Sequence, residues 1–293
     1  MQSLARSLRA PFRGLIILTR TMIRRRNLAR AMVIILIITP IFSPSYNRPP
    51  PHYRDLESRC PTGENQEGCA NPNNETVFIS VSLFDPGGKL VNGAWGKTVL
   101  ELIHLIGNDN VFLSIYENDG DSEEEAALDN FRTKLRCRHA LIHDRGNLAQ
   151  QNFPLVTLPD GSKRLKRIAY LSTVRNRALA PLDDMTGPED IKFDKILFLN
   201  DNAFKAIDAA HLLFNTNLGE DGKTHYLAAC GLDYFTPFLY YDTFALRDAE
   251  GYSIGIPMFP IFAKAGRGIS RSAVLVETDS VPVKSCWAGM VAV

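Results

Sequence analysis

The stretch "KILFLNDNAF" at residues 195–204 decides the fold. Its first half is a short apolar run, as in a buried strand, and its second half places Asp201 between two amides. An apolar pattern with helical spacing then runs from Ala203 to Phe214. A buried strand followed at once by a helix is typical of α/β proteins, which bind ligands at the carboxyl ends of their strands. Asp201 is therefore either a ligand-binding residue or the N-cap of the helix, and the local sequence leaves both readings open.

The chain upstream of this stretch alternates between strands and helices. Strands are predicted at 76–84, 110–119, 139–142 and 195–202, and helices at 96–107, 121–135 and 164–182. The second helix is predicted to begin with a capping box from Ser122 to Glu125, and the third to stop at Pro181. Strands that alternate with helices indicate βαβ units and a mainly parallel sheet.

Polar residues close two of these strands. Asn118 and Asp119 end the second strand, and Asn200 precedes Asp201 at the end of the fourth. The sequence contains neither a GxGxxG dinucleotide fingerprint nor a GxxxxGK[ST] phosphate loop, so a diphosphate ligand would need a metal ion or arginine residues. A strand-end carboxylate can hold Mg²⁺ or Mn²⁺ through one or two oxygens, which makes Asp201 the predicted metal ligand.

Charge is distributed unevenly along the 293 residues. Residues 1–30 contain eight arginines and no acid, so the remainder is acidic overall, and a generally basic nucleic-acid-binding surface is excluded. The apolar run "AMVIILIITPIF" follows at 31–42. We predict a signal anchor with the basic arm in the cytosol. A cleaved signal peptide, a mitochondrial presequence and a buried helix are the alternatives.

Residues 43–75 are predicted to form a Pro-rich extended stem, and residues 76–293 the globular domain. Two features of the stem favour the secretory route. Asn74 begins the N-glycosylation acceptor "NET". Cys60 and Cys69 flank a Pro- and Gly-containing loop that could close as a disulfide or keep two free thiols. The other three cysteines lie in apolar contexts and are expected to be buried, and no Cys/His cluster has the spacing of a zinc site.

Five strings in the same order carry a family resemblance. They are "STVRNRALAPL" (172–182), "FDKILFLNDNAF" (193–204), "LAACGLDYF" (227–235), "LYYDTFALRDAEG" (239–251) and "VKSCWAGMVAV" (283–293). Together they resemble the fungal capsule-associated α-1,3-mannosyltransferase family, glycosyltransferase family 69. The resemblance implies a GT-A-like, Rossmann-type fold with flanking helices, in a single-pass type II protein of the Golgi membrane. The implied reaction transfers mannose from GDP-mannose to a mannose-containing glycan acceptor, with Mn²⁺ or Mg²⁺ as cofactor.

This reaction assigns roles to the polar residues, because its diphosphate leaving group must be stabilised by a metal or by arginines. The predicted donor-binding residues are Asn118, Asp119, Arg175, Asn176, Arg177, Asn200, Arg247 and Asp248. Asp233 and Asp242 lie in aromatic-rich segments, where an unpaired buried carboxylate is costly, and they are the predicted catalytic residues. Their alternative is a salt bridge with Arg247. The neighbouring aromatic residues could line a sugar site, but most are expected in the core.

Two departures from the resemblance keep a second class of function open. The strand end at 200–202 offers one carboxylate, where Asp-x-Asp enzymes offer two. The chain also stops at Val293, where we expect further acceptor-side elements. A truncated, catalytically inactive chain would serve as a glycan-binding or polysaccharide-assembly subunit. A mitochondrial protein of unrelated function is a third class.

Overall fold

The computed structural model describes residues 24–35, 38, 50–61, 66–118, 120–145, 153–184, 192–236, 239–254, 262 and 264–293. The chain divides into two units, Met1–Pro49 and Pro50–Val293. In the first unit, residues 24–35 and 38 are helical and exposed. No helix within the described residues is long and apolar enough to cross a membrane. Residues 36, 37 and 39–42 of the predicted anchor lie outside the described part of the chain.

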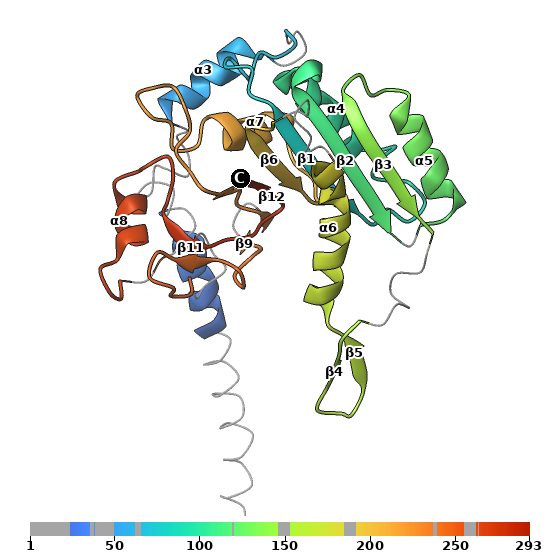
Figure 1. Cartoon of the computed structure of the whole chain (residues 1–293). Helices are drawn as coiled ribbons and strands as arrows, with labels where there is room; N and C mark the ends of the chain where they lie inside the picture. Colours follow the sequence, from blue (N-terminus) through green and yellow to red (C-terminus); the bar gives the residue numbers. More distant parts are fainter. Residues whose placement is uncertain are drawn as a thin grey trace, which may run out of the picture. The chain divides into compact units, whose positions relative to one another are not determined.

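The second unit is built on a six-stranded sheet with the order β3–β2–β1–β6–β12–β7. Its strands are β1 (Val77–Leu83), β2 (Val111–Asn118), β3 (Arg138–Asp144), β6 (Lys195–Leu199), β7 (Ala229–Cys230) and β12 (Met290–Ala292). The first four strands in this order are parallel, and β12 runs antiparallel to both of its neighbours. The predicted mainly parallel α/β sheet is thus confirmed (Figure 1).

Helices and small hairpins surround this sheet. The helices are α3 (Pro51–Arg59), α4 (Ala94–Ile106), the 3₁₀ turn η2 (Asn108–Asn110), α5 (Ser122–Arg132), α6 (Arg167–Asp184), α7 (Ala206–Phe214) and α8 (Ile269–Leu275). The two-stranded sheets are β4 (Leu155–Thr157) with β5 (Lys163–Leu165), β8 (Tyr234–Thr236) with β9 (Leu239–Tyr240), and β10 (Arg247–Asp248) with β11 (Val283–Ser285).

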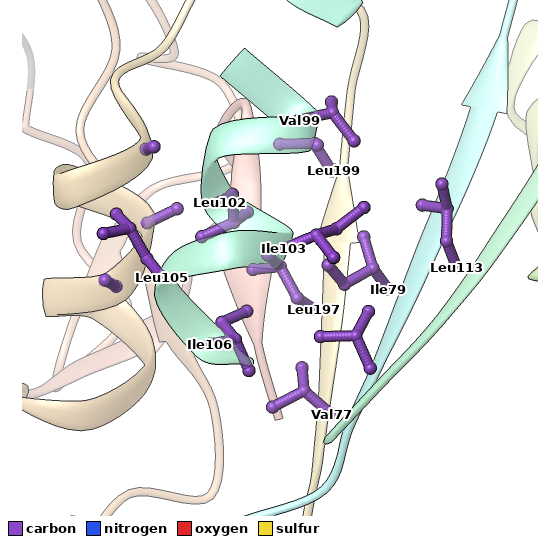
Figure 2. Packing of buried hydrophobic residues seen from close by; sticks show 14 of the residues in the cluster. Val77, Ile79, Val99, Leu102, Ile103, Leu105, Ile106, Leu113, Leu197 and Leu199 are labelled. Carbon is purple, nitrogen blue, oxygen red and sulfur yellow. The ribbon is translucent and has the colours of Figure 1, made fainter. Parts of the chain in front are cut away.

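One face of the sheet is apolar and forms the main core with α4 and α7. Alternate residues of β1 and β6 point to this face because side chains alternate along a strand. Val77, Ile79 and Leu197 are fully buried on it. Figure 2 shows them meeting the apolar stripe of α4, which includes Leu102, Ile103 and Ile106. Full burial of each such side chain contributes about 1.5–3 kcal/mol, so this face supplies much of the stability.

The opposite face carries Ser80, Ser82 and Phe198, one residue out of phase with the core positions. Helix α6 covers this face near β1 and β2, through Val174 and Ala178 (Figure 1). Ser82 and Phe198 are only half-buried, so the cover is incomplete over the junction of β1 and β6.

Two helices differ from the predictions. The capping box of α5 lies one residue earlier: Asp121 accepts the backbone N–H of Glu124, whose side chain accepts the N–H of Asp121. Pro181 lies inside α6 and does not end it. Because Pro181 has no N–H, the helix lacks one hydrogen bond, but only three residues of α6 follow it. The proline ring is buried. Residues 163–165, predicted in part as helix, form β5.

Residues 51–59, predicted within the extended stem, form helix α3. Pro51 suits the first helical turn, where its missing N–H costs nothing. Leu56 is fully buried, and the ring of Tyr53 stacks on His211 of α7 with centroids 4.0 Å apart. Because the segment is rich in proline, its sequence indicated an extended stem, and the helical spacing of Tyr53 and Leu56 was not recognised. The folded unit begins at Pro50.

Two disulfides tie the second unit together. Cys60 and Cys69 are joined, which settles the alternative that the sequence left open. Cys230 and Cys286, expected only to be buried, form a second disulfide across a sequence separation of 56. Cys137 is a buried free thiol. The second bridge links β7 to the turn that precedes β12.

Candidate functional site

Asp201 does not cap the helix that follows it. Helix α7 begins at Ala206, and its N-cap, Lys205, makes no side-chain capping bond. Asp201 is exposed and has no hydrogen-bond or ion-pair partner among the described residues. The N-cap reading is therefore wrong, and the carboxylate is free to meet a ligand.

The amides on either side fix this strand end to the turn at 286–289. The backbone N–H of Asn200 donates to the carbonyl of Gly289 (2.9 Å), and its side-chain Nδ2 donates to the carbonyl of Ala288 (3.1 Å). Asn202 packs directly on Gly289, where an added Cβ would lie 1.9 Å from its Nδ2. A larger residue at Gly289 would displace the side chain of Asn202. The Oδ1 atom of Asn202 is buried and has no hydrogen-bond partner.

A small pocket lies at the junction of β1 and β6, where the strand order reverses. It is lined by Ser80, Ser82, Arg175, Phe198, Leu199, Asn200 and Trp287 and contains about 170 Å³ of empty space. Such reversal points are where open α/β sheets bind ligands. The 170 Å³ include open solvent, so the pocket is a shallow hollow and not an enclosed cavity.

Arg175 is the cation among the residues that line the pocket. Its guanidinium carbon lies 4.1 Å from the centre of the Trp287 ring. It has no ion pair within the described residues, and its Nε is buried without a hydrogen-bond partner. Burial, and then the charge of Arg167, lower the pKa of Arg175, but an arginine stays protonated at neutral pH. A half-buried cation held by a ring favours an anionic ligand.

The neighbouring arginine has a different environment. Arg177 Nη1 pairs with Asp144 Oδ2 (2.5 Å) and donates to the Tyr116 hydroxyl, so it joins α6 to β2 and β3. These contacts, the Tyr116 hydrogen bond first, raise the pKa of Arg177. Asn176 is exposed on α6. Of the three predicted donor-binding residues on this helix, the structure places Arg175 in the pocket.

The remaining donor-binding predictions lie in several places. Asn118 is buried and its Nδ2 donates to the Tyr170 hydroxyl of α6 (2.6 Å), and Asp119 lies outside the described residues. Arg247 donates to backbone carbonyls, with 2.7 Å to that of Leu246. Asp248 is buried and accepts backbone N–H groups of the turn that follows it.

Asp233 and Asp242 lie close enough for their charges to interact. Asp233 Oδ2 accepts the backbone N–H of Gly289 (2.5 Å), so it contacts the same turn as Asn202. Burial raises the pKa of Asp233; the Gly289 bond opposes this and the charge of Asp242 adds to it. Asp242 Oδ1 accepts two backbone N–H groups of its own loop. The structure thus brings Asp233 to the turn at the end of β6, and Asp242 lies near Asp233.

A family match covers all of these elements. The profile of the family described as "Cryptococcal mannosyltransferase 1" matches residues 76–293. The chain belongs to this family. The predicted membership in the capsule-associated mannosyltransferases is confirmed. No curated protein matches the chain at a significant level.

The residues of this site offer a metal ion few protein ligands, so most of its ligands would come from the substrate and from water. The described residues contain no group of three or more His, Cys, Asp or Glu side chains that could hold a metal. The available donor is the exposed carboxylate of Asp201, because the Oδ1 of Asn202 is buried against Gly289. Mg²⁺ usually binds through one or two carboxylates and completes its shell with waters and substrate phosphates, so the single carboxylate of Asp201 fits an ion of this kind.

The sequence reasoning missed several residues of this mannosyltransferase-family site. They are Ser80, Ser82, Asn202, Trp287 and Gly289. The two serines carried a usable signal, because they are the polar residues of an otherwise apolar strand and share one face. Trp287 and Gly289 lie in one of the strings of the resemblance, but nothing local shows that they reach β6.

Proposed function

We propose that this chain is a glycosyltransferase that moves mannose from GDP-mannose to a mannose-containing glycan or polysaccharide, forming an α-1,3 linkage. Family membership supports the class of reaction. The observation that carries the proposal is Arg175, a cation without a carboxylate partner in the described chain, in a pocket at the strand reversal beside Ser80, Ser82 and Asn200.

Arg175 stabilises the leaving group in this mechanism. Breaking the bond between sugar and phosphate puts negative charge on the diphosphate, and a cation already in position stabilises that charge without reorganising. The stack on Trp287 keeps the guanidinium in place before the substrate binds. A Mn²⁺ or Mg²⁺ ion held by Asp201 would supply further charge neutralisation when bound.

Asp233 and Asp242 act on the acceptor side in this proposal. The raised pKa of Asp233 makes its carboxylate a better acceptor for the proton of the attacking sugar hydroxyl. Its bond to Gly289 fixes it relative to the end of β6. Transfer from an α-linked donor to an α-linked product retains configuration, and both a covalent nucleophile and a front-face path are compatible with two neighbouring carboxylates.

The proposed location is the Golgi membrane, in single-pass type II orientation. Three features support it. Eight arginines and no acid lie in residues 1–30, as expected for a cytosolic arm before an anchor at 31–42. The acceptor Asn74 is exposed. Two disulfides suit an oxidising lumen.

The test combines binding and turnover on the full-length chain in detergent. GDP affinity with and without Mn²⁺ is measured for the wild type, Arg175→Ala and Arg175→Lys, with the exposed Arg164→Ala as matched control. We expect Arg175→Ala to weaken GDP binding about tenfold, the scale of a lost charge-assisted contact, and Arg175→Lys to recover part of it. Mannose transfer from GDP-mannose to α-linked mannosides is then assayed.

Two outcomes decide against the proposal. A wild-type chain that binds no GDP has no donor site of this kind. GDP binding without transfer to any mannoside favours the alternative, a catalytically inactive glycan-binding or polysaccharide-assembly subunit. The single carboxylate at residues 200–202 is the observation that keeps this alternative in view.

A further inference from the structure

The loop that carries Asp233 and Asp242 presents large aromatic side chains to solvent. Phe235 is 70% exposed, Tyr241 58% and Phe244 80%. These three residues are called the aromatic platform below. The sequence led us to expect most of them in the core, and only the neighbouring Tyr240 is deeply buried, at 3% exposure. Exposed apolar surface that gathers in one loop marks a binding site.

Two rings of the aromatic platform, those of Phe235 and Tyr241, are held by contacts within the loop. The rings of Phe235 and Tyr241 meet edge to face with centroids 4.5 Å apart. The hairpin β8–β9 pairs Tyr234 with Tyr240, and Tyr240 packs into a small core with Leu246. The backbone N–H of Tyr241 donates to the carbonyl of Asp233 (2.8 Å). The rings of Phe235 and Tyr241 therefore lose little conformational entropy when a ligand packs on them.

The aromatic platform is continuous with the candidate site. Asp242 Oδ1 accepts the backbone N–H of Phe244 (3.0 Å), so this carboxylate lies beside the backbone that carries one of the exposed rings. Asp233 precedes Phe235 by two residues and binds the turn at Gly289 that holds the end of β6. A ligand on the rings would therefore lie near both carboxylates, and Asp233 contacts the turn that also carries Trp287 of the pocket.

We propose that the aromatic platform is the acceptor subsite, where a pyranose ring of the glycan packs its C–H face on the exposed rings. The inference rests on the proposed function, because a mannosyltransferase needs a second sugar beside its donor. Asp233 and Asp242 accept hydrogen bonds from the sugar hydroxyls, and hydrogen bonds to a charged acceptor are the stronger kind. A neutral sugar suits this mixture of apolar faces and carboxylates. The same two carboxylates repel an anionic lipid surface.

The experiment uses the full-length chain and α-1,3-linked mannotriose as the probe. Its binding is measured by ligand-detected NMR without nucleotide, and its KM in mannose transfer is measured at saturating GDP-mannose. Phe235→Ala and Phe244→Ala are expected to weaken binding and raise the acceptor KM at least about fivefold, since each removes buried apolar contact area. GDP affinity should change less than about twofold, within the scatter of distant substitutions. Phe244→Trp should retain binding.

Leu227→Ala is the matched control. Leu227 is 95% exposed and follows Tyr226, whose ring contacts Lys195 at the opposite end of β6. It should change neither binding nor KM. Unchanged mannotriose binding and KM in both phenylalanine variants overturn the proposal. So does a wild type that binds no mannoside, which is the result expected if a protein or lipid covers the rings. If the chain binds no GDP but loses mannotriose binding on Phe244→Ala, the proposed transferase function is wrong. The aromatic platform is then still a glycan-binding site.

Discussion

Arg175 of α6 and Trp287 of the turn before β12 stack on one another, with the guanidinium carbon 4.1 Å from the ring centre. Arg175 lies near the middle of the matched region 76–293, and Trp287 lies near its C-terminal end. Hydrogen bonds from Asn200 hold the same turn against β6. The stack therefore fixes a positive charge over the junction of β1 and β6, without a carboxylate that would compete with a ligand.

Replacing Trp287 should weaken donor binding through Arg175. A cation–π contact contributes about 0.5–2 kcal/mol, so Trp287→Ala is expected to reduce GDP affinity about three- to thirtyfold, and Trp287→Phe less. Calorimetric titration with GDP measures both, with thermal unfolding as a control for loss of packing. If the folded Trp287→Ala variant binds GDP as tightly as the wild type, the stack does not position Arg175.

Asp201→Asn should abolish the metal dependence of GDP binding and leave the fold intact. The side chain is exposed and caps no helix, so the free energy of unfolding should change by less than about 0.5 kcal/mol. The wild type is expected to bind GDP more tightly with Mn²⁺. Asn202→Ala should lose less, because an amide is a poorer ligand for a hard cation than a carboxylate. Equal Mn²⁺ dependence in the wild type and Asp201→Asn would remove the metal site.

The two disulfides should differ in their effects. In the chain-entropy model, the Cys230–Cys286 bridge, with a separation of 56, contributes about 4 kcal/mol, and the Cys60–Cys69 bridge, with a separation of 9, about 2.5 kcal/mol. Double serine variants of each pair are compared by urea unfolding. Loss of Cys230–Cys286 should also weaken GDP binding, since Cys286 adjoins Trp287. A Cys60/Cys69 variant that lost GDP affinity equally would show a general effect of destabilisation.

Stability should fall in mild acid because of His211. Burial, and then the charge of His52, lower the pKa of His211 from 6.5 to about 4. Its Nδ1 lies 3.2 Å from the Asn215 amide, its ring stacks on Tyr53, and Glu57 is 4.0 Å from its Nε2. The folded state takes up this proton less readily than the unfolded state. Stability is therefore complete above pH 6.5 and is lost as the pH falls toward 4.

The check is urea unfolding between pH 7 and 4.5. His211→Gln should flatten the pH dependence, while the exposed His225→Gln should leave it unchanged. The same pH slope in the wild type and His211→Gln would assign the acid sensitivity to other groups.

Expression in a eukaryotic secretory system should give a glycan on Asn74. Glycosidase treatment should then increase the mobility of the wild type and not of Asn74→Asp. Asp is the better replacement here because Asn74 has φ of 51°, a region that Asp tolerates and Gln rarely adopts. No mobility shift, together with a protease-accessible C-terminal region in intact vesicles, would contradict the lumenal orientation.

The parallel half of the sheet could be predicted because each strand carries its own signal. Strands β1, β2 and β6 are apolar runs between polar turns, and α4 has a clear stripe. The antiparallel strands could not be predicted. Strand β7 has two residues and β12 three, which is too short for any periodicity, and their place is set by partners distant in sequence.

The candidate site was predictable in its residue types and less so in its contacts. Arg175 and Arg177 look equivalent in the sequence. Only the fold shows that Arg177 pairs with Asp144 and that Arg175 stacks on Trp287. The partnership of Asp233 with Gly289 is likewise tertiary. The exposure of Phe244 could not be inferred, because an aromatic loop reads the same whether it is buried or presented to a ligand.

The pairing of β12 with β6 has a consequence for how the chain is made. Everything from α7 to β11 is synthesised between the two strands, so β6 emerges with one edge unpaired. Pairing across such sequence distances is slow, and an apolar strand edge invites association with other chains. Cys230 also remains a free thiol until Cys286 has been synthesised. The yield of native protein should therefore depend on chaperone holding and on an oxidant that acts after β12 has entered the sheet, and synthesis in a reducing cytosol should give aggregates.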